Sequence, residues 1–269
     1  MMQTILTTPI RHTHDTAKCQ TKPMGFQGSI QPHGVLLVIE STSKTIEAVS
    51  QSCETLLGMP ACQLLGRTLG QVFGPLAEPT LLEPAHDGLQ PLTSLTRNGR
   101  RFSAKSCQND AGQILVDIEP SELYETSMEG LTYLCRRGLD TLRRLDNSAE
   151  IYKVGAEVIR TITGFDQVMI CRFDADYRGE VIAESTAENV ESYLGCHLTA
   201  SDIPQQDRHL LKLCRVRMIP DVRYHPSALL TNTHSPSVDM GVSGLRCVLP
   251  SHIKCLKNMG PAPVWCLRC

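Results

Sequence analysis

The stretch GSIQPHGVLLVIE, residues 28–40, combines a turn with a buried strand. Its first part, Gly28 to Gly34, holds two glycines and a proline, residues that interrupt regular structure and are typical of turns. The apolar run Val35–Ile39 follows, with the length and composition of a strand buried on both faces. It is far shorter than the roughly 18 apolar residues that a membrane-spanning helix needs. We therefore predict a folded domain built around this strand.

The residues after this strand predict a compact α+β domain over 19–120, preceded by a flexible polar arm over 1–18. Asn98-Gly99 and the turn at 109–112 are hairpin signals between alternating segments. The predicted strands are Val35–Ile39, Thr45–Ser50, Leu92–Arg97, Arg101–Cys107 and Ile114–Glu119, and the predicted short helices are Glu54–Leu57 and Ala61–Leu65.

A second α+β domain is predicted over 147–260, after an amphipathic helix within 121–146 that links the two domains. Asn147 and Glu150 form a candidate capping box for the next helix, and Gly164 ends it. The further predictions are strands over Gln167–Phe173, Gly179–Ser185 and Val216–Val222, and helices over Glu188–Leu194 and from Pro204, capped by Ser201 or Asp202.

Length and charge exclude several classes of protein. The chain has 269 residues, room for two domains at about 100–200 residues each. Its net charge of −2, with both signs interspersed, argues against binding to nucleic acid or an anionic membrane. The first residues lack the pattern of a secretory signal, so we expect a cytoplasmic protein. No nucleophile–base pair, phosphate loop or metal cluster is apparent, which makes an enzyme the weakest interpretation.

The 12 cysteines stand singly, mostly in apolar patterns, so we expect most of them to be reduced and buried. Cys266 and Cys269 form a lone CxxC, and no second pair lies at the spacing of a zinc site. We expect no metal there.

Several short motifs in fixed order resemble the photosensory region of bacteriophytochromes, over roughly residues 19–260. The first is Cys19 followed by GSIQPHG. The others are TGFDQVM at 163–169, GEVIAE at 179–184, SDIPQ at 201–205, Leu245-Arg246 leading to His252, and LKNMG at 256–260. Unrelated motifs in one order are much more specific than any single motif.

The resemblance implies a PAS domain followed by a GAF domain, with the N-terminal segment passing through a loop of the GAF domain to form a knot. It further implies that the GAF domain binds a linear tetrapyrrole, biliverdin in bacteria, and that light isomerises the double bond at ring D. Cys19 stands at the family's attachment position, where a thiolate forms a thioether with ring A. Without the GSIQPHG peptide at this spacing, we would interpret Cys19 as one of 12 ordinary cysteines, lying in a flexible N-terminal segment.

The same resemblance assigns further contacts with the tetrapyrrole. Asp202, in the peptide Asp202-Ile203-Pro204, would direct its main-chain carbonyl at the pyrrole nitrogens. The residues alone favour a helix N-cap at Asp202, and the two roles can coexist. Arg217 and Arg246 would bind the two propionates, although most arginines are solvated surface charges. The expected contacts are completed by Ile30 and His252.

The pocket around ring D departs from the family pattern. Tyrosines are common where this chain has Cys171, Leu211 and Cys255, so aromatic packing and hydroxyl donors are both lost. We expect weakened photochemistry. Ser251 stands where relatives that bind phycocyanobilin attach it through cysteine, which favours biliverdin and Cys19.

Residues 261–269 do not resemble the family. One encoding of Pro263–Cys269, read in a neighbouring frame, gives Ala-Ser-Met-Val-Ser-Ala-Leu, similar to the next family strand. We therefore expect a frameshift that truncates the GAF domain and leaves an aberrant tail without an output module; resequencing of the gene tests this hypothesis. The alternative to a photoreceptor fragment is a non-functional product or a pigment-free module that forms a homodimer through the Tyr124–Leu145 face of the linking helix.

Overall fold

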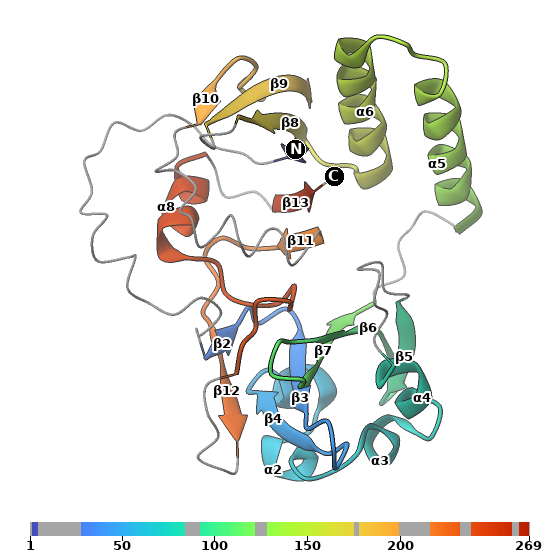
Figure 1. Cartoon of the computed structure of the whole chain (residues 1–269), viewed down its shortest axis with the longest axis vertical. Coiled ribbons are helices and arrows are strands. Elements are labelled where there is room, and N and C mark those ends of the chain that lie inside the picture. The colour runs from blue at the N-terminus through green and yellow to red at the C-terminus, as the bar shows by residue number, and fades with distance from the viewer. Residues whose placement is uncertain are drawn as a thin grey trace.

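The computed structural model describes residues 2–4, 28–83, 92–121, 128–174, 178–198, 216–231, 238–259 and 264–268. These residues form two antiparallel sheets, each with flanking helices (Figure 1). The predicted α+β class is confirmed. The predicted knot stays a prediction, because residues 5–27, which would lead into it, lie outside the described part of the chain.

The seven-stranded sheet contains the turn and strand that open the sequence analysis. Its order is β2-β12-β4-β3-β7-β6-β5, and every neighbouring pair is antiparallel. The strands are β2 (Ser29–Ile30), β3 (Val35–Ile39), β4 (Ile46–Ser50), β5 (Thr93–Arg97), β6 (Arg100–Gln108), β7 (Ile114–Pro120) and β12 (Ser227–Thr231). Strands β3 to β7 agree with the predicted ones to within a residue or two at each end.

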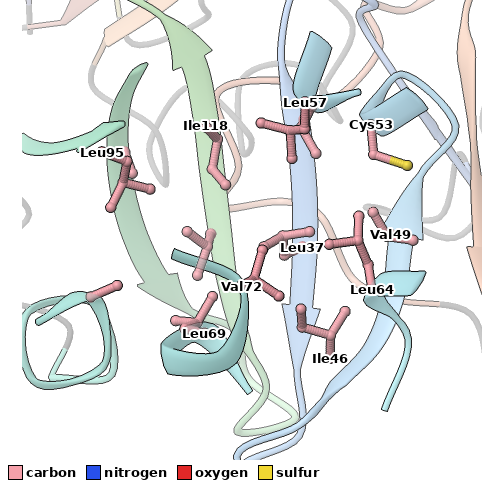
Figure 2. Close-up of a cluster of buried hydrophobic side chains, with 14 of the residues drawn as sticks. Leu37, Ile46, Val49, Cys53, Leu57, Leu64, Leu69, Val72, Leu95 and Ile118 are labelled. Atoms are coloured by element: carbon pink, nitrogen blue, oxygen red, sulfur yellow. The ribbon is translucent and has the colours of Figure 1, made fainter. Parts of the chain in front are cut away.

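Four short helices cover one face of this sheet (Figure 2): α1 (Cys53–Leu57), α2 (Ala61–Leu64), α3 (Leu69–Phe73) and α4 (Ala77–Leu81). Leu37 and Ile118 point into this core, together with Leu64 and Leu69 from the helices. Successive residues of a strand face opposite sides of a sheet. Leu36, next to Leu37, therefore faces the other way, where it packs with Met240 and Leu245 from the second half of the chain. Both faces of β3 are buried, which explains its continuous apolar run.

The six-stranded sheet has the order β10-β9-β8-β1-β13-β11. Its strands are β1 (Met2–Thr4), β8 (Gln167–Phe173), β9 (Gly179–Thr186), β10 (His197–Leu198), β11 (Val216–Ile219) and β13 (Val264–Arg268). Helix α6 (Ser148–Thr163) packs on one face, where its Ala156 meets Val168 and Ile170. Helix α8 (Pro250–Met259) lies on the other face and places Leu256 against Met169 and Cys171.

Helix α5 (Met128–Leu142) precedes α6 and packs beside it (Figure 1). Asn147 caps α6 as predicted, but its Oδ1 accepts the N–H of Ala149 at 2.8 Å instead of the N–H of Glu150 that a capping box requires. Gly164 ends α6 in the left-handed region, with φ of 72°, as predicted.

The predicted helix over Glu188–Leu194 is wrong, because this segment forms turns. Asn189 has φ of 67°, which an α-helix does not allow. The carboxylate of Glu184 accepts the backbone N–H groups of Tyr193 and Leu194, so these groups bond outside any helical ladder. The predicted strand Val216–Val222 is shorter than expected, since β11 ends before Pro220, which has no N–H to donate. The helix expected from Pro204 lies outside the described residues.

Five strands come from segments to which the sequence assigned no strand: the two-residue strands β2 and β10, and the three longer strands β1, β12 and β13. Met2–Thr4, predicted to belong to a flexible arm, forms β1 between β8 and β13. Val264–Arg268, predicted to be an aberrant tail, pairs with β11 along four residues. Strand β12 adds to the edge of β4 in the other sheet. Each pairing satisfies backbone groups of a partner strand that is distant in sequence.

Candidate functional site

The turn peptide at 28–34 lies directly beside residues 238–248, here called the site loop. Ile30 is fully buried and forms an antiparallel bridge with Arg246. The N–H of Gln31 donates to the carbonyl of Leu245 at 2.8 Å, and the N–H of Cys247 donates to the carbonyl of Ser29 at 3.4 Å. Two predicted site residues, Ile30 and Arg246, are thus brought together although 216 positions separate them in the sequence.

Arg217 joins them from β11. Its side chain is buried, and its Nη2 donates to the carbonyl of Arg246 at 2.6 Å. The guanidinium of Arg246 is also buried, and its Nη1 donates to the carbonyls of Gly241 and Ser243 at 3.2 and 3.0 Å. The exposed fractions of the two arginines, 4% and 3%, exclude the alternative that they are solvated surface charges.

The charge of Arg217 is poorly compensated. Among the described residues, its buried Nε has no hydrogen-bond partner and no carboxylate forms an ion pair with Arg217. A buried guanidinium without an anion is costly, because burial removes its hydration. The site therefore suits a ligand that carries a carboxylate or another anion.

Gln31 is a site residue that the sequence analysis missed. It is fully buried, and its Nε2 donates to the carbonyl of Met218 at 3.1 Å and to that of Arg246 at 3.5 Å. Its Oε1 is buried without a partner among the described residues. A signal existed, because Gln31 lies inside the GSIQPHG peptide that carries the family resemblance.

Tyr224 is a second missed residue. Its hydroxyl accepts the N–H of Val248 at 2.9 Å, at the end of the site loop. Burial raises the pKa of Tyr224 to about 12, although the charge of Arg217 acts in the opposite direction. The phenol is therefore neutral at physiological pH and holds the site loop as a hydrogen-bond acceptor.

Cys171 lies in β8 on the sheet face that α8 covers, fully buried among Met169, Val181 and Val248. In this environment Cys171 acts as a small apolar side chain that fills the core. Seven cysteines of the described residues are free thiols, of which Cys53, Cys171 and Cys247 are buried and Cys62 is exposed. The other three are partly buried, so the expectation that most cysteines are buried does not hold among these seven.

The remaining predicted site residues cannot be placed. His252, Cys255 and Ser251 belong to α8, but the described part of the structure does not extend to their side chains. The predicted residues that lie outside the described part altogether are Cys19, Asp202, Ile203, Pro204 and Leu211.

Among the described residues, no group of three His, Cys, Asp or Glu side chains could hold a metal ion. No described helix is long and apolar enough to cross a membrane.

Comparison with known families gives a match to a PAS fold over residues 19–121. Among curated proteins, the chain is 34% identical to the phytochrome-like protein Cph1 of Synechocystis sp. over 248 residues, which is 86% of this chain and 32% of that protein. It is 35% identical to a bacteriophytochrome of Xanthomonas campestris pv. campestris over 259 residues, 91% of this chain and 40% of that protein. The chain thus spans about a third of the length of these relatives.

Among solved structures, the chain resembles the chromophore-binding domain of a wild-type phytochrome from Stigmatella aurantiaca. The TM-score is 0.81 at 34% identity, and the match covers 92% of this chain and 84% of that domain.

Proposed function

The chain belongs to the phytochrome family, and on this basis we propose that it is a light-sensing domain that binds a linear tetrapyrrole, biliverdin, in the GAF half of the chain. The proposal includes a thioether to Cys19 and light-driven isomerisation at ring D. Signalling output would come from the full-length protein, of which this sequence corresponds to about a third of the relatives' length.

The observation that carries this proposal is the buried pair of guanidinium groups. Biliverdin has two propionate carboxylates, and Arg217 has a buried Nε without a partner among the described residues. A planar guanidinium suits a carboxylate because it can donate two parallel hydrogen bonds. Arg217 and Arg246 would hold one propionate each. Hydrogen bonds from Nη1 of Arg246 to the carbonyls of Gly241 and Ser243 orient its guanidinium.

The other predicted residues would orient the pigment. The main-chain carbonyl of Asp202 would accept the pyrrole N–H groups, beside Ile203 and Pro204, and His252 would donate a hydrogen bond near the inner rings. Ile30, held against Arg246 by its backbone bridge, would contribute an apolar wall.

Attachment requires no oxidant. The thiolate of Cys19 would add to the vinyl group of ring A, so that one C–S bond replaces the π bond and the other vinyl carbon takes up a proton. The bound tetrapyrrole supplies absorption of red light and the isomerisable double bond. Cys171 is smaller than tyrosine and a weaker donor, so with Leu211 and Cys255 it would hold ring D loosely and reduce the yield of isomerisation.

The first test is an absorbance spectrum of the purified chain after incubation with biliverdin, repeated after red illumination. We expect a red band, and covalent pigment on a denaturing gel by zinc-induced fluorescence. Cys19→Ala should remove the covalent signal, whereas the matched control Cys62→Ala, at an exposed thiol of α2, should keep it. Soluble protein without a red band would refute the proposal.

A second test addresses the carboxylates. Arg217→Gln should weaken biliverdin binding by about 10- to 150-fold, the equivalent of roughly 1.5–3 kcal/mol for a hydrogen bond to a charged group. Arg172→Gln is the matched control, because Arg172 is an exposed arginine of β8 in the same six-stranded sheet and pairs with Glu180 at 3.0 Å. Equal losses in the two variants would contradict the role of Arg217.

A second candidate function is homodimerisation through the linking helix. Tyr133 and Leu139 of α5 are 62% and 53% exposed, so this helix leaves two large apolar side chains uncovered although it packs against α6. Light scattering of the purified chain tests this: Leu139→Glu should shift a dimer to monomer without affecting the red band.

A further inference from the structure

Asp117 is a buried carboxylate at the boundary between the seven-stranded sheet and the site loop. It lies in β7, with its side chain 2% exposed. Its neighbours Val116 and Ile118 face the helices α1 to α4. Leu115, two residues before Asp117, faces the site loop and packs with Met240 and Leu245. A charge in this apolar contact is costly unless both of its oxygens are bonded.

Both oxygens of Asp117 bind the site loop. The hydroxyl of Ser243 donates to Oδ1 at 2.6 Å, and the N–H of Gly244 donates to Oδ2 at 2.8 Å. Ser243 Oγ in turn accepts the N–H of Leu245 at 3.1 Å. On the other side, Lys105 Nζ lies 3.8 Å from Oδ2. One side chain of the PAS half therefore fixes three consecutive residues of the GAF half.

The turn that Asp117 fixes is also the turn that orients Arg246. The carbonyl of Ser243 accepts Nη1 of Arg246 at 3.0 Å, and the carbonyl of Arg246 accepts Nη2 of Arg217 at 2.6 Å. A continuous series of hydrogen bonds thus leads from Asp117 through Ser243 to both arginines. Such series hold ligand-binding groups to within about 0.5 Å of the productive geometry.

We propose that Asp117 is a positioning residue for pigment binding: it holds the site loop so that the guanidinium groups of Arg246 and Arg217 meet the two propionates. The inference rests on the proposed function, since it takes biliverdin as the ligand of these arginines. The inference adds a residue of the PAS half to the binding site. Asp117 would affect the affinity for the pigment through the site loop, without contacting the pigment itself.

The test compares biliverdin with its dimethyl ester, in which both carboxylates are masked. Asp117→Asn has nearly the same size as the original but places an amide N–H₂ against the donors Ser243 and Gly244. In the full chain it should weaken biliverdin binding roughly tenfold, about 1.4 kcal/mol, and change the affinity for the ester less than about twofold. Asp110→Asn, at an exposed aspartate of the β6–β7 turn, is the matched control and should change neither affinity.

Two further variants keep the inference falsifiable if Asp117→Asn unfolds. Ser243→Ala removes one hydrogen bond to Asp117 and leaves all charged groups in place. It should lower the ratio of the affinities for biliverdin and its dimethyl ester, by a smaller factor than Asp117→Asn. In an Arg246→Gln background, Asp117→Asn should cost little additional affinity, because the group that it positions is gone.

The outcomes separate the two claims. Equal losses for biliverdin and its ester, or full additivity with Arg246→Gln, would reduce Asp117 to a structural role and overturn this inference alone. An unmodified chain that binds no biliverdin would overturn the proposed function, and this inference with it.

Discussion

Gly34 allows the seven-stranded sheet to approach the site loop closely, so Gly34→Ala should disturb both. A Cβ at this position would lie 2.5 and 2.8 Å from the two Cδ atoms of Leu245, and 3.0 Å from the carbonyl oxygen of Ile118. Leu245 is fully buried and has little space to move into. Gly34 is not among the glycines with positive φ. Its backbone conformation is therefore open to alanine, and the expected cost is steric.

The magnitude follows from known effects of overpacking. An extra methyl group in a packed core costs about 1–3 kcal/mol, and the lower chain entropy of alanine returns about 0.4–1 kcal/mol. We expect Gly34→Ala to lower the free energy of unfolding by about 1–2 kcal/mol. Leu245→Ala alone should cost about 2–5 kcal/mol. In the double variant both clashing Cδ atoms are absent, so the new methyl group meets only the carbonyl of Ile118.

The assay is a double-mutant cycle measured by urea unfolding, with free energies extrapolated to water. We expect a coupling of about 1–2 kcal/mol between Gly34→Ala and Leu245→Ala. Gly155→Ala, in α6, replaces Gly34→Ala in the control cycle and should be additive with Leu245→Ala. Additivity within about 0.5 kcal/mol at Gly34, or a stabilised Gly34→Ala protein, would refute the close approach.

Three further changes have defined outcomes. Gly155→Ala in α6 should raise the free energy of unfolding by about 0.5–1 kcal/mol, because the nearest atom to the new Cβ would be Cδ1 of Ile170 in β8, at an ordinary contact distance of 3.8 Å. The same change at Gly138 should not stabilise the protein, because there the Cβ would collide with Val158 of α6. Urea unfolding that gives both variants equal stability would contradict this. Tyr224→Phe should cost about 1–3 kcal/mol, because the backbone N–H that it binds at 2.9 Å is left unsatisfied; an unchanged urea midpoint would argue against that bond. The pKa of Glu40 is lowered from 4.5 to about 2, chiefly by the hydrogen bond from the backbone N–H of Ser43. The contribution of Glu40 to stability should therefore be present above pH 4.5 and lost as the pH falls toward 2. A stability difference between the wild type and Glu40→Gln that stays constant across this range would contradict the shift.

Local signals in the sequence predicted the local structure well. The run Val35–Ile39 is β3 with the predicted bounds, and Gly164 ends α6. The errors come from long-range pairing. A helix was predicted over residues 188–194, but the carboxylate of Glu184 accepts the backbone N–H groups of Tyr193 and Leu194. Nothing in residues 227–231 indicates that they complete a sheet built by residues 35–120.

For the candidate site, too, the sequence predicted some residues and could not indicate the partners that lie far away in the chain. Arg217, Arg246 and Ile30 were predicted through the family resemblance, and the structure brings them together. Periodicity and composition would not have found them, because their burial depends on a loop that meets a peptide more than 200 positions earlier. Asp117 did carry a signal, as the one charge inside the apolar strand Ile114–Ile118. Its partners could not be deduced from that signal.

Strand β12 has a consequence for the nascent chain. The strands β3 to β7 are complete when residue 120 has left the ribosome, but the edge of β4 is covered only when Ser227–Thr231 arrive. At synthesis rates of about 5–20 residues per second, this edge stays open for roughly 5–20 s. Open edges are templates for pairing with other chains. Translation speed and chaperone access during this interval should therefore affect the yield of folded protein.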